Sequence, residues 1–299
     1  MNVVIITAFT LVAFAANSLL CRMTLGGHLI DPVSFTTIRL VSGALALILI
    51  IRLSGESKKP KQAKGSWGSG LALFAYAAAF SLAYVSLSTG MGALILFGSV
   101  QVTMISVALK SGEKLGPVQW IGLATALSGL IYLVMPGILA PDPLGALLMC
   151  VSGIAWGVYS IRGTGVSAPV FMTAGNFTRS APLAIITSAI AVSVVHLEPF
   201  GILLALISGI VTSGLGYVLW YKALRSLTTT QASVVQLMVP VLAAFGGVVF
   251  LSEQVSVRLI AASAVILGGV ALAIIKRKPK AGPKYGASLT TEPDISTMD

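Results

Sequence analysis

Long apolar stretches, interrupted by short segments that contain proline, glycine or charged residues, run through most of the chain. Residues 65–109 lack any charged side chain. A single crossing of a bilayer needs about 20 helical residues, so this stretch holds two crossings, and we place the turn between them at Thr89-Gly90. The pattern predicts ten helical spans, at 3–21, 33–51, 67–88, 91–109, 117–135, 144–162, 170–195, 200–221, 229–250 and 257–275.

The composition agrees with helices embedded in a membrane. Of the 299 residues, 56% are apolar and 9% are charged, whereas a soluble domain carries roughly a quarter charged residues. This excludes a soluble enzyme and a nucleic-acid-binding protein, despite the net charge of +10. Cys21 and Cys150 both lie in apolar stretches, so we expect no disulfide, metal site or cofactor. The predicted fold class is an all-α membrane protein.

The positions of the basic residues predict how the chain is oriented. With the N-terminus placed inside, fifteen Lys and Arg residues fall in inner loops or the C-terminal segment, and three, Arg22, Arg39 and Arg258, fall on the outer side. Cytoplasmic loops are enriched in Lys and Arg, so both termini are expected in the cytoplasm. The basic runs are interpreted as topology signals; a specific anionic-lipid site is the alternative. Residues 280–299 lack apolar periodicity and are typical of a disordered tail.

The two halves of the chain resemble each other at an offset of 140 residues. This offset aligns Arg22 with Arg162, Arg39 with Arg179, Glu113 with Glu253, and Gly129 with Gly269. Matches between charged residues are informative because the chain has so few of them. We predict two five-helix repeats, at 1–139 and 141–279. An odd number of crossings makes the second repeat enter the membrane from the opposite side, which is the inverted arrangement of many transporters.

Acidic residues and histidines lie in loops, at span ends or in the tail. They are Asp31, Glu56, Glu113, Asp142, Glu198, Glu253, Glu292, Asp294, Asp299, His28 and His196. Ionisable side chains inside the membrane commonly mark proton relays, so their absence from the span centres favours transport down the substrate gradient without proton coupling. The Walker A, H-E-x-x-H and buried acid-pair patterns of enzymes are also absent from the sequence, and no catalytic residues are expected.

Neutral hydrogen-bonding groups and aromatic rings inside the spans form the candidate substrate site. Amides and hydroxyls would bind a zwitterion, and aromatic rings would contact its side chain. The candidates are Asn17, Tyr76, Phe80, Gln101, Trp156, Tyr159, Tyr217, Ser233 and Gln236. The alternative for the amides is a hydrogen bond between helices, and the alternative for the aromatic residues is packing in the core.

Several residues nearer the span ends are expected to have structural roles. Tyr84, Trp220 and Tyr221 are close enough to an end to act as anchors at the membrane interface. Arg39 and Arg179 lie about two turns into their spans. We expect these arginines to extend to lipid phosphate or to cap backbone carbonyls; pairing with an anionic substrate is the alternative.

Two local motifs are expected to alter the predicted helices. Pro240 lies inside the ninth span and cannot donate to the carbonyl of Gln236, four residues earlier. That oxygen needs another partner, so a helix break beside the Gln236 amide and Ser233 could bind an ammonium or amide group; a simple kink is the alternative. Gly153 and Gly157 form a G-x-x-x-G motif, which is typical of close helix packing.

The second half of the sequence carries a family resemblance. It rests on Tyr221-Lys222-Ala223-Leu224, Gln231-Ala232-Ser233, Pro240, Glu253 and Gly268-Gly269. These residues resemble the second-repeat signature of the EamA-type drug/metabolite transporter superfamily, whereas the first repeat has Val100 where the second has Pro240. The resemblance implies an inverted basket of ten helices. It also implies efflux of aromatic and other neutral amino acids through a central cavity, as in a bacterial inner-membrane exporter of this group.

We therefore expect an inner-membrane exporter of neutral amino acids and related metabolites that works by alternating access. Cationic drugs are a second substrate class, but pumps for them rely on a membrane carboxylate. Nucleotide sugars or phosphate esters are a third, and would need further central cations. A scaffold that binds lipid without transport would explain the basic loops but not the repeat. The expected partners are the substrate and the lipid bilayer; a monomer is expected, and the sequence leaves dimerisation open.

Overall fold

The computed structural model describes residues 2–54, 65–112, 115–135, 141–254 and 256–274. Within these ranges the regular secondary structure is helical, apart from one isolated antiparallel bridge between Ile30 and Leu197. The elements are α1 (Val3–Gly26), α2 (Pro32–Leu53), α3 (Trp67–Ala83), α4 (Thr89–Lys110), α5 (Pro117–Val134), α6 (Pro143–Arg162), α7 (Pro169–Ile190), the 3₁₀ turn η1 (Val192–Val194), α8 (Pro199–Ile207), the π-helix η2 (Ser208–Leu215), α9 (Gly216–Leu224), α10 (Thr229–Val235), α11 (Met238–Leu251) and α12 (Val257–Ile274). The all-α prediction is confirmed for the described residues.

Each predicted span coincides with a helix or with consecutive helices. The eighth span consists of α8, η2 and α9, and the ninth consists of α10 and α11. The first helix continues to Gly26, beyond its predicted end at 21, and the third ends at Ala83, before its predicted end at 88. The seventh span also ends earlier than predicted, at Ile190, because the chain turns into η1. Within the described ranges, six stretches are long and apolar enough to cross a membrane: Val3–Gly26, Pro32–Leu53, Thr89–Lys110, Pro143–Arg162, Pro199–Leu224 and Thr229–Leu251. Residues 280–299 and Glu113, for which predictions were made, lie outside the described residues.

Proline and aspartate explain where several helices begin. Proline is the first helical residue of five helices, at Pro32, Pro117, Pro143, Pro169 and Pro199. The first amide of a helix has no partner within the helix, so proline is tolerated there. Asp31 and Asp142 precede two of these prolines, and their carboxylates accept hydrogen bonds from amides of the first turn. These helix starts therefore follow from local sequence.

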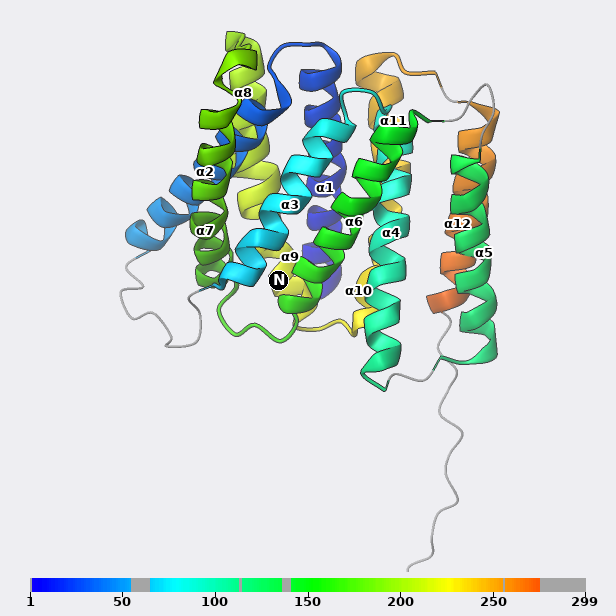
Figure 1. Cartoon of the computed structure of the whole chain (residues 1–299). Coiled ribbons are helices and arrows are strands. Elements are labelled where there is room, and N and C mark those ends of the chain that lie inside the picture. Colours follow the sequence, from blue (N-terminus) through cyan, green and yellow to red (C-terminus); the bar gives the residue numbers. More distant parts are fainter. Residues whose placement is uncertain (1, 55–64, 113–114, 136–140, 255, 275–299) are drawn as a thin grey trace, which may run out of the picture.

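Helices that are distant in sequence lie side by side in the bundle (Figure 1). α2 packs against α7, α3 against α6, and α5 against α12. α4 packs against α6 and α11, while α1 packs against η2, α9 and α11. The first and last described helical residues, at the start of α1 and the end of α12, lie at the same end of the bundle. The core therefore forms between the two halves of the chain.

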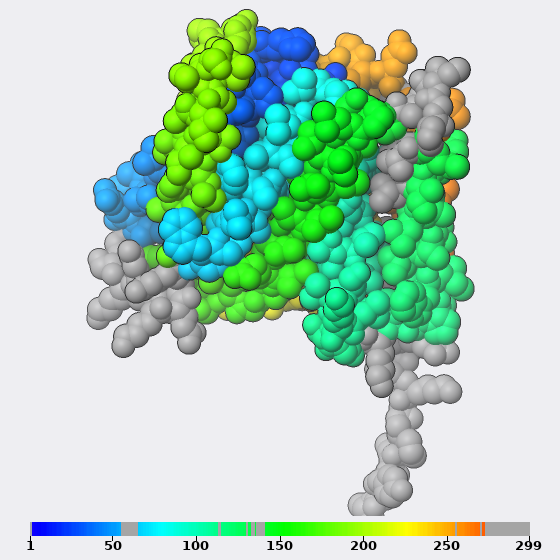
Figure 2. Space-filling view, in the orientation of Figure 1, coloured from blue at the N-terminus to red at the C-terminus, as the bar shows by residue number. Residues whose placement is uncertain are grey.

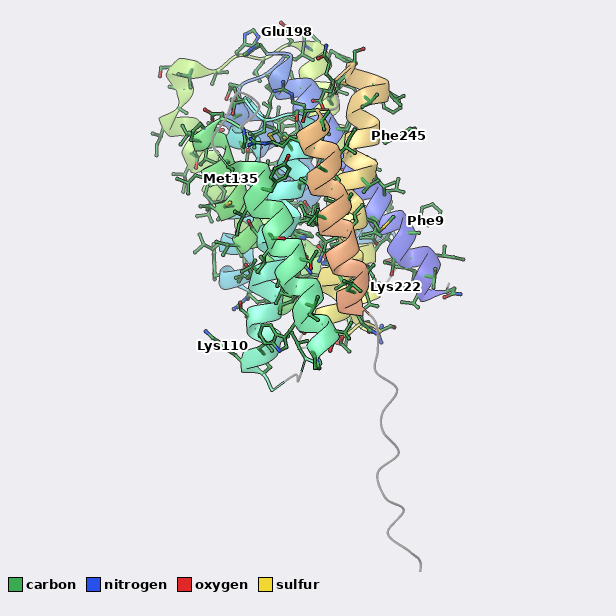
Figure 3. All side chains as sticks on the ribbon, turned by 90° about the vertical axis from the view of Figure 1, so that its right-hand side faces the viewer. Phe9, Lys110, Met135, Glu198, Lys222 and Phe245 are labelled. Atoms are coloured by element: carbon green, nitrogen blue, oxygen red, sulfur yellow. The ribbon has the colours of Figure 1, made fainter. Side chains whose placement is uncertain are left out.

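Charged residues lie at both ends of the bundle (Figure 3). Lys110 and Lys222 lie at the end where α1 begins, which we call the basic end. Glu198 lies at the opposite end, which we call the acidic end. Between the ends, the sides of the bundle expose large apolar side chains such as Phe9, 60% exposed, and Phe245, 69% exposed. Apolar sides between two polar ends suit a protein surrounded by lipid.

Small residues allow the helices to approach closely. A Cβ added to Gly153 of α6 would lie 2.6 Å from the Cβ of Ser99 in α4, and one added to Gly157 would lie 2.9 Å from the Cβ of Thr103. The predicted packing role of this G-x-x-x-G motif is therefore confirmed. In Figure 2, α3 and α6 cross the same face of the molecule side by side, and side chains fill the space between their ribbons.

Asp31 joins two loops at the acidic end. Its carboxylate accepts hydrogen bonds from the amides of Val33 (3.0 Å) and Ser34 (2.8 Å) at the start of α2. It also accepts one from the amide of His196 (3.1 Å), in the loop before α8. Burial by itself would raise the pKa of the Asp31 carboxyl, but the hydrogen bonds outweigh it and hold the pKa below its ordinary value of 3.8. The ionised form therefore stabilises the folded protein.

Asp31→Ala is expected to lower the free energy of unfolding by about 1–2 kcal/mol at neutral pH, because the α2 cap is lost. The folded-state pKa is depressed, so the contribution of the carboxylate is complete above pH 3.8 and is lost as the pH falls through the folded-state pKa. Thermal unfolding of both proteins in detergent, from about pH 7 to about pH 3, measures the difference. A Tm difference between the unmodified protein and Asp31→Ala that is constant over this pH range would contradict stabilisation by the ionised Asp31 carboxylate.

Candidate functional site

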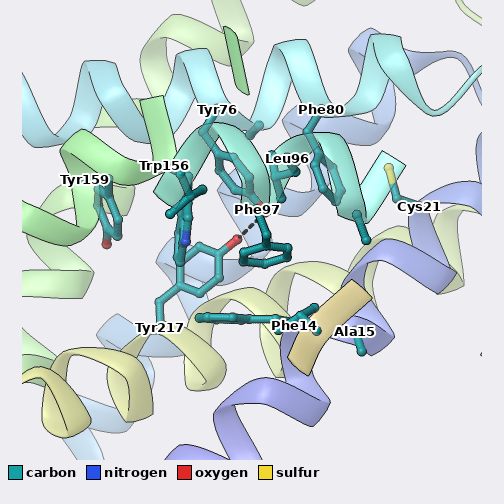
Figure 4. Close-up of a cluster of buried hydrophobic side chains, with 14 of the residues drawn as sticks. Phe14, Ala15, Cys21, Tyr76, Phe80, Leu96, Phe97, Trp156, Tyr159 and Tyr217 are labelled. Atoms are coloured by element: carbon teal, nitrogen blue, oxygen red, sulfur yellow. Dashed lines mark hydrogen bonds between the residues drawn. The ribbon is translucent and has the colours of Figure 1, made fainter. Parts of the chain in front are cut away.

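Eight aromatic side chains meet in the interior of the bundle and form what we call the aromatic cluster (Figure 4). The cluster consists of Phe14 of α1, Tyr76 and Phe80 of α3, Phe97 of α4, Trp156 and Tyr159 of α6, and Tyr217 and Trp220 of α9. The centroid of the Trp156 ring lies 4.6 Å from that of Tyr217, 4.9 Å from that of Tyr76 and 5.2 Å from that of Phe14. Each of the eight side chains is at most 5% exposed. The cluster is therefore closed to solvent in this conformation.

Arg39 of α2 lies against this cluster and is fully buried. Its Nε donates to Ser213 Oγ (2.8 Å), and its Nη2 donates to the hydroxyls of Tyr76 (3.1 Å) and Tyr217 (2.6 Å). Its guanidinium carbon lies 5.2 Å from the ring centroids of both Tyr76 and Phe80. Nη1 has no hydrogen-bond partner among the described residues. The expectation that Arg39 extends to lipid phosphate is therefore wrong, because its side chain points into the bundle.

Asn17 of α1 links the aromatic cluster to the π-helix η2. Its Oδ1 accepts hydrogen bonds from the hydroxyls of Ser208 (2.7 Å), Thr212 (3.0 Å) and Ser213 (3.4 Å), and its Nδ2 donates to Tyr76 Oη (3.4 Å). The i→i+5 bonding of a π-helix places residues four and five apart on one face, so all three hydroxyls reach one oxygen. The interhelical hydrogen bonds that were considered for Asn17 are present in the structure.

A second amide, Gln236, contacts the cluster where the ninth span is interrupted. α10 ends at Val235 and α11 begins at Met238. Gln236 Oε1 accepts a hydrogen bond from the Trp156 indole (2.8 Å), and its Nε2 donates to the carbonyl of Ala232. The backbone carbonyl of Gln236 accepts from the amide of Val239 (3.0 Å). The expectation of a free carbonyl, left by Pro240, is therefore wrong, because the next turn tightens and supplies a partner.

The structure brings most of the predicted site residues together. Asn17, Tyr76, Phe80, Trp156, Tyr159, Tyr217 and Gln236 belong to the aromatic cluster or bond to it. Gln101 and Ser233 are buried as well, but the contacts of the described residues do not join them to the cluster. The Nε2 of Gln101 and the hydroxyl of Tyr159 are buried without a hydrogen-bond partner among the described residues.

Three aromatic residues that were expected to be interface anchors are buried instead. Tyr84, Trp220 and Tyr221 are each 0% exposed. The Trp220 indole donates to Ser160 Oγ (3.0 Å), and the Tyr221 hydroxyl donates to the Tyr159 carbonyl (3.1 Å). The anchor prediction is wrong because burial depends on which helices pack around a residue, and proximity to a helix end does not determine this.

Arg39 and Phe14 are the main residues that the sequence-based site left out. Phe14 precedes Asn17 by three residues, and residues with this spacing share one face of a helix. The position of Asn17 in the site could therefore have indicated Phe14 as well. Arg39 stands out in the sequence as a charged residue within a span, which is a functional signal by default. The sequence does not show which neighbours it meets.

Contacts between helix ends join α1, α4 and the segment after α11 at the acidic end. Both carboxylate oxygens of Glu253 accept from the Thr89 amide (3.0 Å each), and Oε1 also accepts from the Thr89 hydroxyl (3.0 Å). Arg22 Nε lies 3.5 Å from Glu253 Oε1, and Arg22 Nη1 donates to the carbonyls of Tyr84 and Val85. We call Arg22, Thr89 and Glu253 the end cluster. These contacts hold the end of α1, the start of α4 and the segment after α11 together.

The fold and the buried centre together define a class of protein. A bundle of apolar helices with polar ends encloses aromatic rings, amides, hydroxyls and one guanidinium, a set suited to a small organic molecule. The chain is accordingly a membrane transporter of small metabolites. Residues 143–275 match the model of the EamA-like transporter family. The chain belongs to this family.

Several curated proteins are similar to this chain in sequence, and some of them are named as transporters. The chain is 46% identical to the uncharacterized protein PA1977 of Pseudomonas aeruginosa over 277 residues, which cover 93% of this chain and 96% of that protein. It is 26% identical to the uncharacterized transporter YoaV of Bacillus subtilis, over 83% of this chain and 89% of YoaV. It is also 26% identical to the threonine/homoserine exporter RhtA of Salmonella typhimurium, over 84% of this chain and 85% of RhtA.

One solved structure is similar in fold. It is described as the crystal structure of a protein and superimposes with a TM-score of 0.65 at 22% sequence identity, covering 89% of this chain and 97% of that one. At this identity the likeness concerns the fold alone.

Proposed function

We propose that the chain exports aromatic and other neutral amino acids, and related small metabolites, across the bacterial inner membrane by alternating access. The observation that carries the proposal is the aromatic cluster, which is buried in the bundle and bordered by the Asn17 and Gln236 amides. Aromatic faces fit the side chain of such a substrate, and the amides and hydroxyls fit its zwitterionic part.

The proposed architecture has ten membrane-crossing helices in two inverted repeats, 1–139 and 141–279. Three observations support it. The family model matches residues 143–275, close to the bounds of the second repeat. Helices that hold the same position in the two proposed repeats lie side by side in three cases: α2 with α7, α4 with α10 and α11, and α5 with α12. Lys110 and Lys222 lie at the basic end, which we assign to the cytoplasm together with both termini.

The proposed energy source is the substrate gradient. The carboxylates of Asp31, Asp142, Glu198 and Glu253 all lie at helix ends or in loops. Among the described residues no acidic side chain lies within a membrane-crossing helix to carry a proton. The same arrangement disfavours cationic drugs as substrates, because a drug cation would meet Arg39 without a compensating carboxylate.

Trp156→Phe and Gln236→Ala are each expected to reduce amino-acid flux into liposomes at least about tenfold, because each removes the indole–amide hydrogen bond beside the aromatic cluster. Flux of labelled phenylalanine through purified, reconstituted protein is the measurement, without an imposed pH gradient. Trp67→Phe is the matched control, since Trp67 begins α3 and is 63% exposed.

The control is expected to retain the flux of the unmodified protein, and all three variants are expected to insert and fold. Undiminished flux in Trp156→Phe and Gln236→Ala would exclude the aromatic cluster as the substrate site. Flux that strictly required a pH gradient would exclude facilitated diffusion. A competitor panel of unlabelled amino acids, drugs and nucleotide sugars then defines the substrate class.

A further inference from the structure

Arg39 carries a positive charge into the centre of the bundle without a negative charge to balance it. Its side chain is 0% exposed, and the ion pairs among the described residues do not include it. Its three hydrogen-bond acceptors, on Ser213, Tyr76 and Tyr217, are neutral hydroxyls. An arginine does not lose its proton in a protein. Since buried charges are normally paired, this site is electrostatically incomplete.

One of its donors is also unused. Nη1 of Arg39 is buried without a hydrogen-bond partner among the described residues. A buried donor that is left unpaired is costly, so such a group in a native structure calls for an explanation, and a bound ion is one. The guanidinium therefore lacks a hydrogen-bond acceptor for Nη1 and a negative charge to balance its own. A carboxylate supplies the acceptor and the charge, and its two oxygens match the planar donor fork of arginine.

An anion bound to Arg39 would lie next to the aromatic cluster. Both phenols that accept from Nη2, those of Tyr76 and Tyr217, belong to the cluster, and their hydroxyls lie 3.2 Å apart. The rings of both tyrosines flank that of Trp156, at 4.9 Å and 4.6 Å between centroids. A carboxylate on the guanidinium therefore places the rest of its molecule among aromatic rings.

We propose that Arg39 binds the carboxylate of the transported molecule, and that the substrates are small monocarboxylates with an apolar or aromatic body. This inference rests on the proposed transport function and names the chemical group that its site recognises. One guanidinium balances one negative charge. The residue that matches Arg39 in the other repeat, Arg179, is half-buried and donates to the Gly175 carbonyl of its own helix. A phosphate ester with two negative charges would therefore have one buried cation at this site, and one of its charges would stay unbalanced.

Binding to the unmodified protein tests the inference directly. The probes are 3-phenylpropionate, its amide 3-phenylpropionamide, phenethylamine and phenyl phosphate, each added to purified protein in detergent while thermal unfolding is followed. A ligand that binds the folded state raises Tm. The carboxylate is expected to raise Tm at concentrations about 10- to 100-fold lower than the amide or the amine, because the amide and the amine leave the charge on Arg39 unbalanced. Equal potency of acid and amide would overturn the inference, as would tighter binding of phenyl phosphate.

Variants of Arg39 provide a second test. Arg39→Gln is expected to bind the carboxylate and the amide equally, whereas Arg39→Lys keeps the charge and retains a preference for the carboxylate. Arg179→Gln is the matched control and is expected to keep the full preference. A preserved preference in Arg39→Gln would overturn the inference. If Arg39→Gln does not fold, the comparison of acid with amide on the unmodified protein still decides the question.

Flux measurements separate this inference from the proposed function. Liposomes with the unmodified protein are tested for uptake of labelled phenylalanine in competition with phenylalanine or phenylalaninamide. Flux inhibited equally by both competitors would overturn carboxylate recognition and keep the transporter. Selective binding of 3-phenylpropionate without flux of any carboxylate would keep the Arg39 site and overturn transport. Flux that only the acid inhibits supports both.

Discussion

Gly209→Ala is expected to destabilise the bundle by about 3 kcal/mol, or roughly 6–12 °C in Tm, because the added methyl group has no room. Gly209 lies in η2 and faces α2. Its added Cβ would collide with the Ser42 hydroxyl and the Arg39 carbonyl, and would lie 2.9 Å from the Arg39 Cα. Two of these three atoms are backbone atoms, which cannot move aside without displacing α2. The same displacement would shift the Arg39 guanidinium away from Tyr76 and Tyr217.

Gly268→Ala is the matched control for this change. Gly268 lies in α12, is exposed, and has no atom within 4 Å of an added Cβ. Alanine is the better helix former by about 1 kcal/mol, so this control is expected to be neutral or slightly stabilising. Thermal unfolding of the purified proteins in detergent measures both effects. Equal Tm values for Gly209→Ala and the unmodified protein would contradict the close packing of η2 on α2.

Glu253→Ala is expected to increase the rate at which a thiol reagent modifies Cys21 by about 10- to 100-fold, because hydrogen bonds to a charged group are lost at the end cluster. Cys21 is fully buried and precedes Arg22 in α1. Without Glu253, neither Thr89 nor Arg22 has the carboxylate that joins α4, α1 and the end of α11. The helices at the acidic end then part more often and expose the thiol.

The measurement is the rate of maleimide labelling in a Cys150→Ser background, which leaves Cys21 as the one reactive thiol of the chain. Glu198→Ala is the matched control, because Glu198 also lies at the acidic end but is about half exposed, with Oε1 3.5 Å from His196 Nε2. This control is expected to label at the rate of the background protein. Equal labelling rates in Glu253→Ala and Glu198→Ala would show that the end cluster does not limit access to Cys21. The Tm values of both variants show whether they remain folded.

Helix positions could be predicted from the sequence because the signals are local. Apolar runs of about 20 residues, prolines at first helical positions and aspartates before them are all contained within a few residues. The boundaries of α2, α5 and α6 consequently agree with prediction within one residue or two at each end. The π-helix η2 was not predicted, because nothing in Ser208–Leu215 by itself widens a helix. Its packing against Asn17 and α2 is a tertiary feature.

The residues of the candidate site could be predicted from the sequence better than the hydrogen bonds between them. Periodicity placed Tyr76 and Phe80 on one face of α3, and Trp156 and Tyr159 together in α6, and these four side chains meet. The sequence did not reveal the bond between Trp156 and Gln236, which spans 80 positions. It was misleading for Trp220, where nearness to a helix end suggested an anchor although the residue is buried.

The sequence by itself determined that this chain is an apolar helical protein, where its helices start, and that its acids lie outside the centres of the predicted spans. These properties depend on hydropathy, capping and residue counts, which act between near neighbours along the chain. Only the tertiary structure decided that Arg39 points inward at two tyrosines and keeps one donor unpaired. The direction of a long side chain in a membrane helix depends on which neighbouring helices offer it acceptors. Those acceptors are 37, 174 and 178 positions away from Arg39.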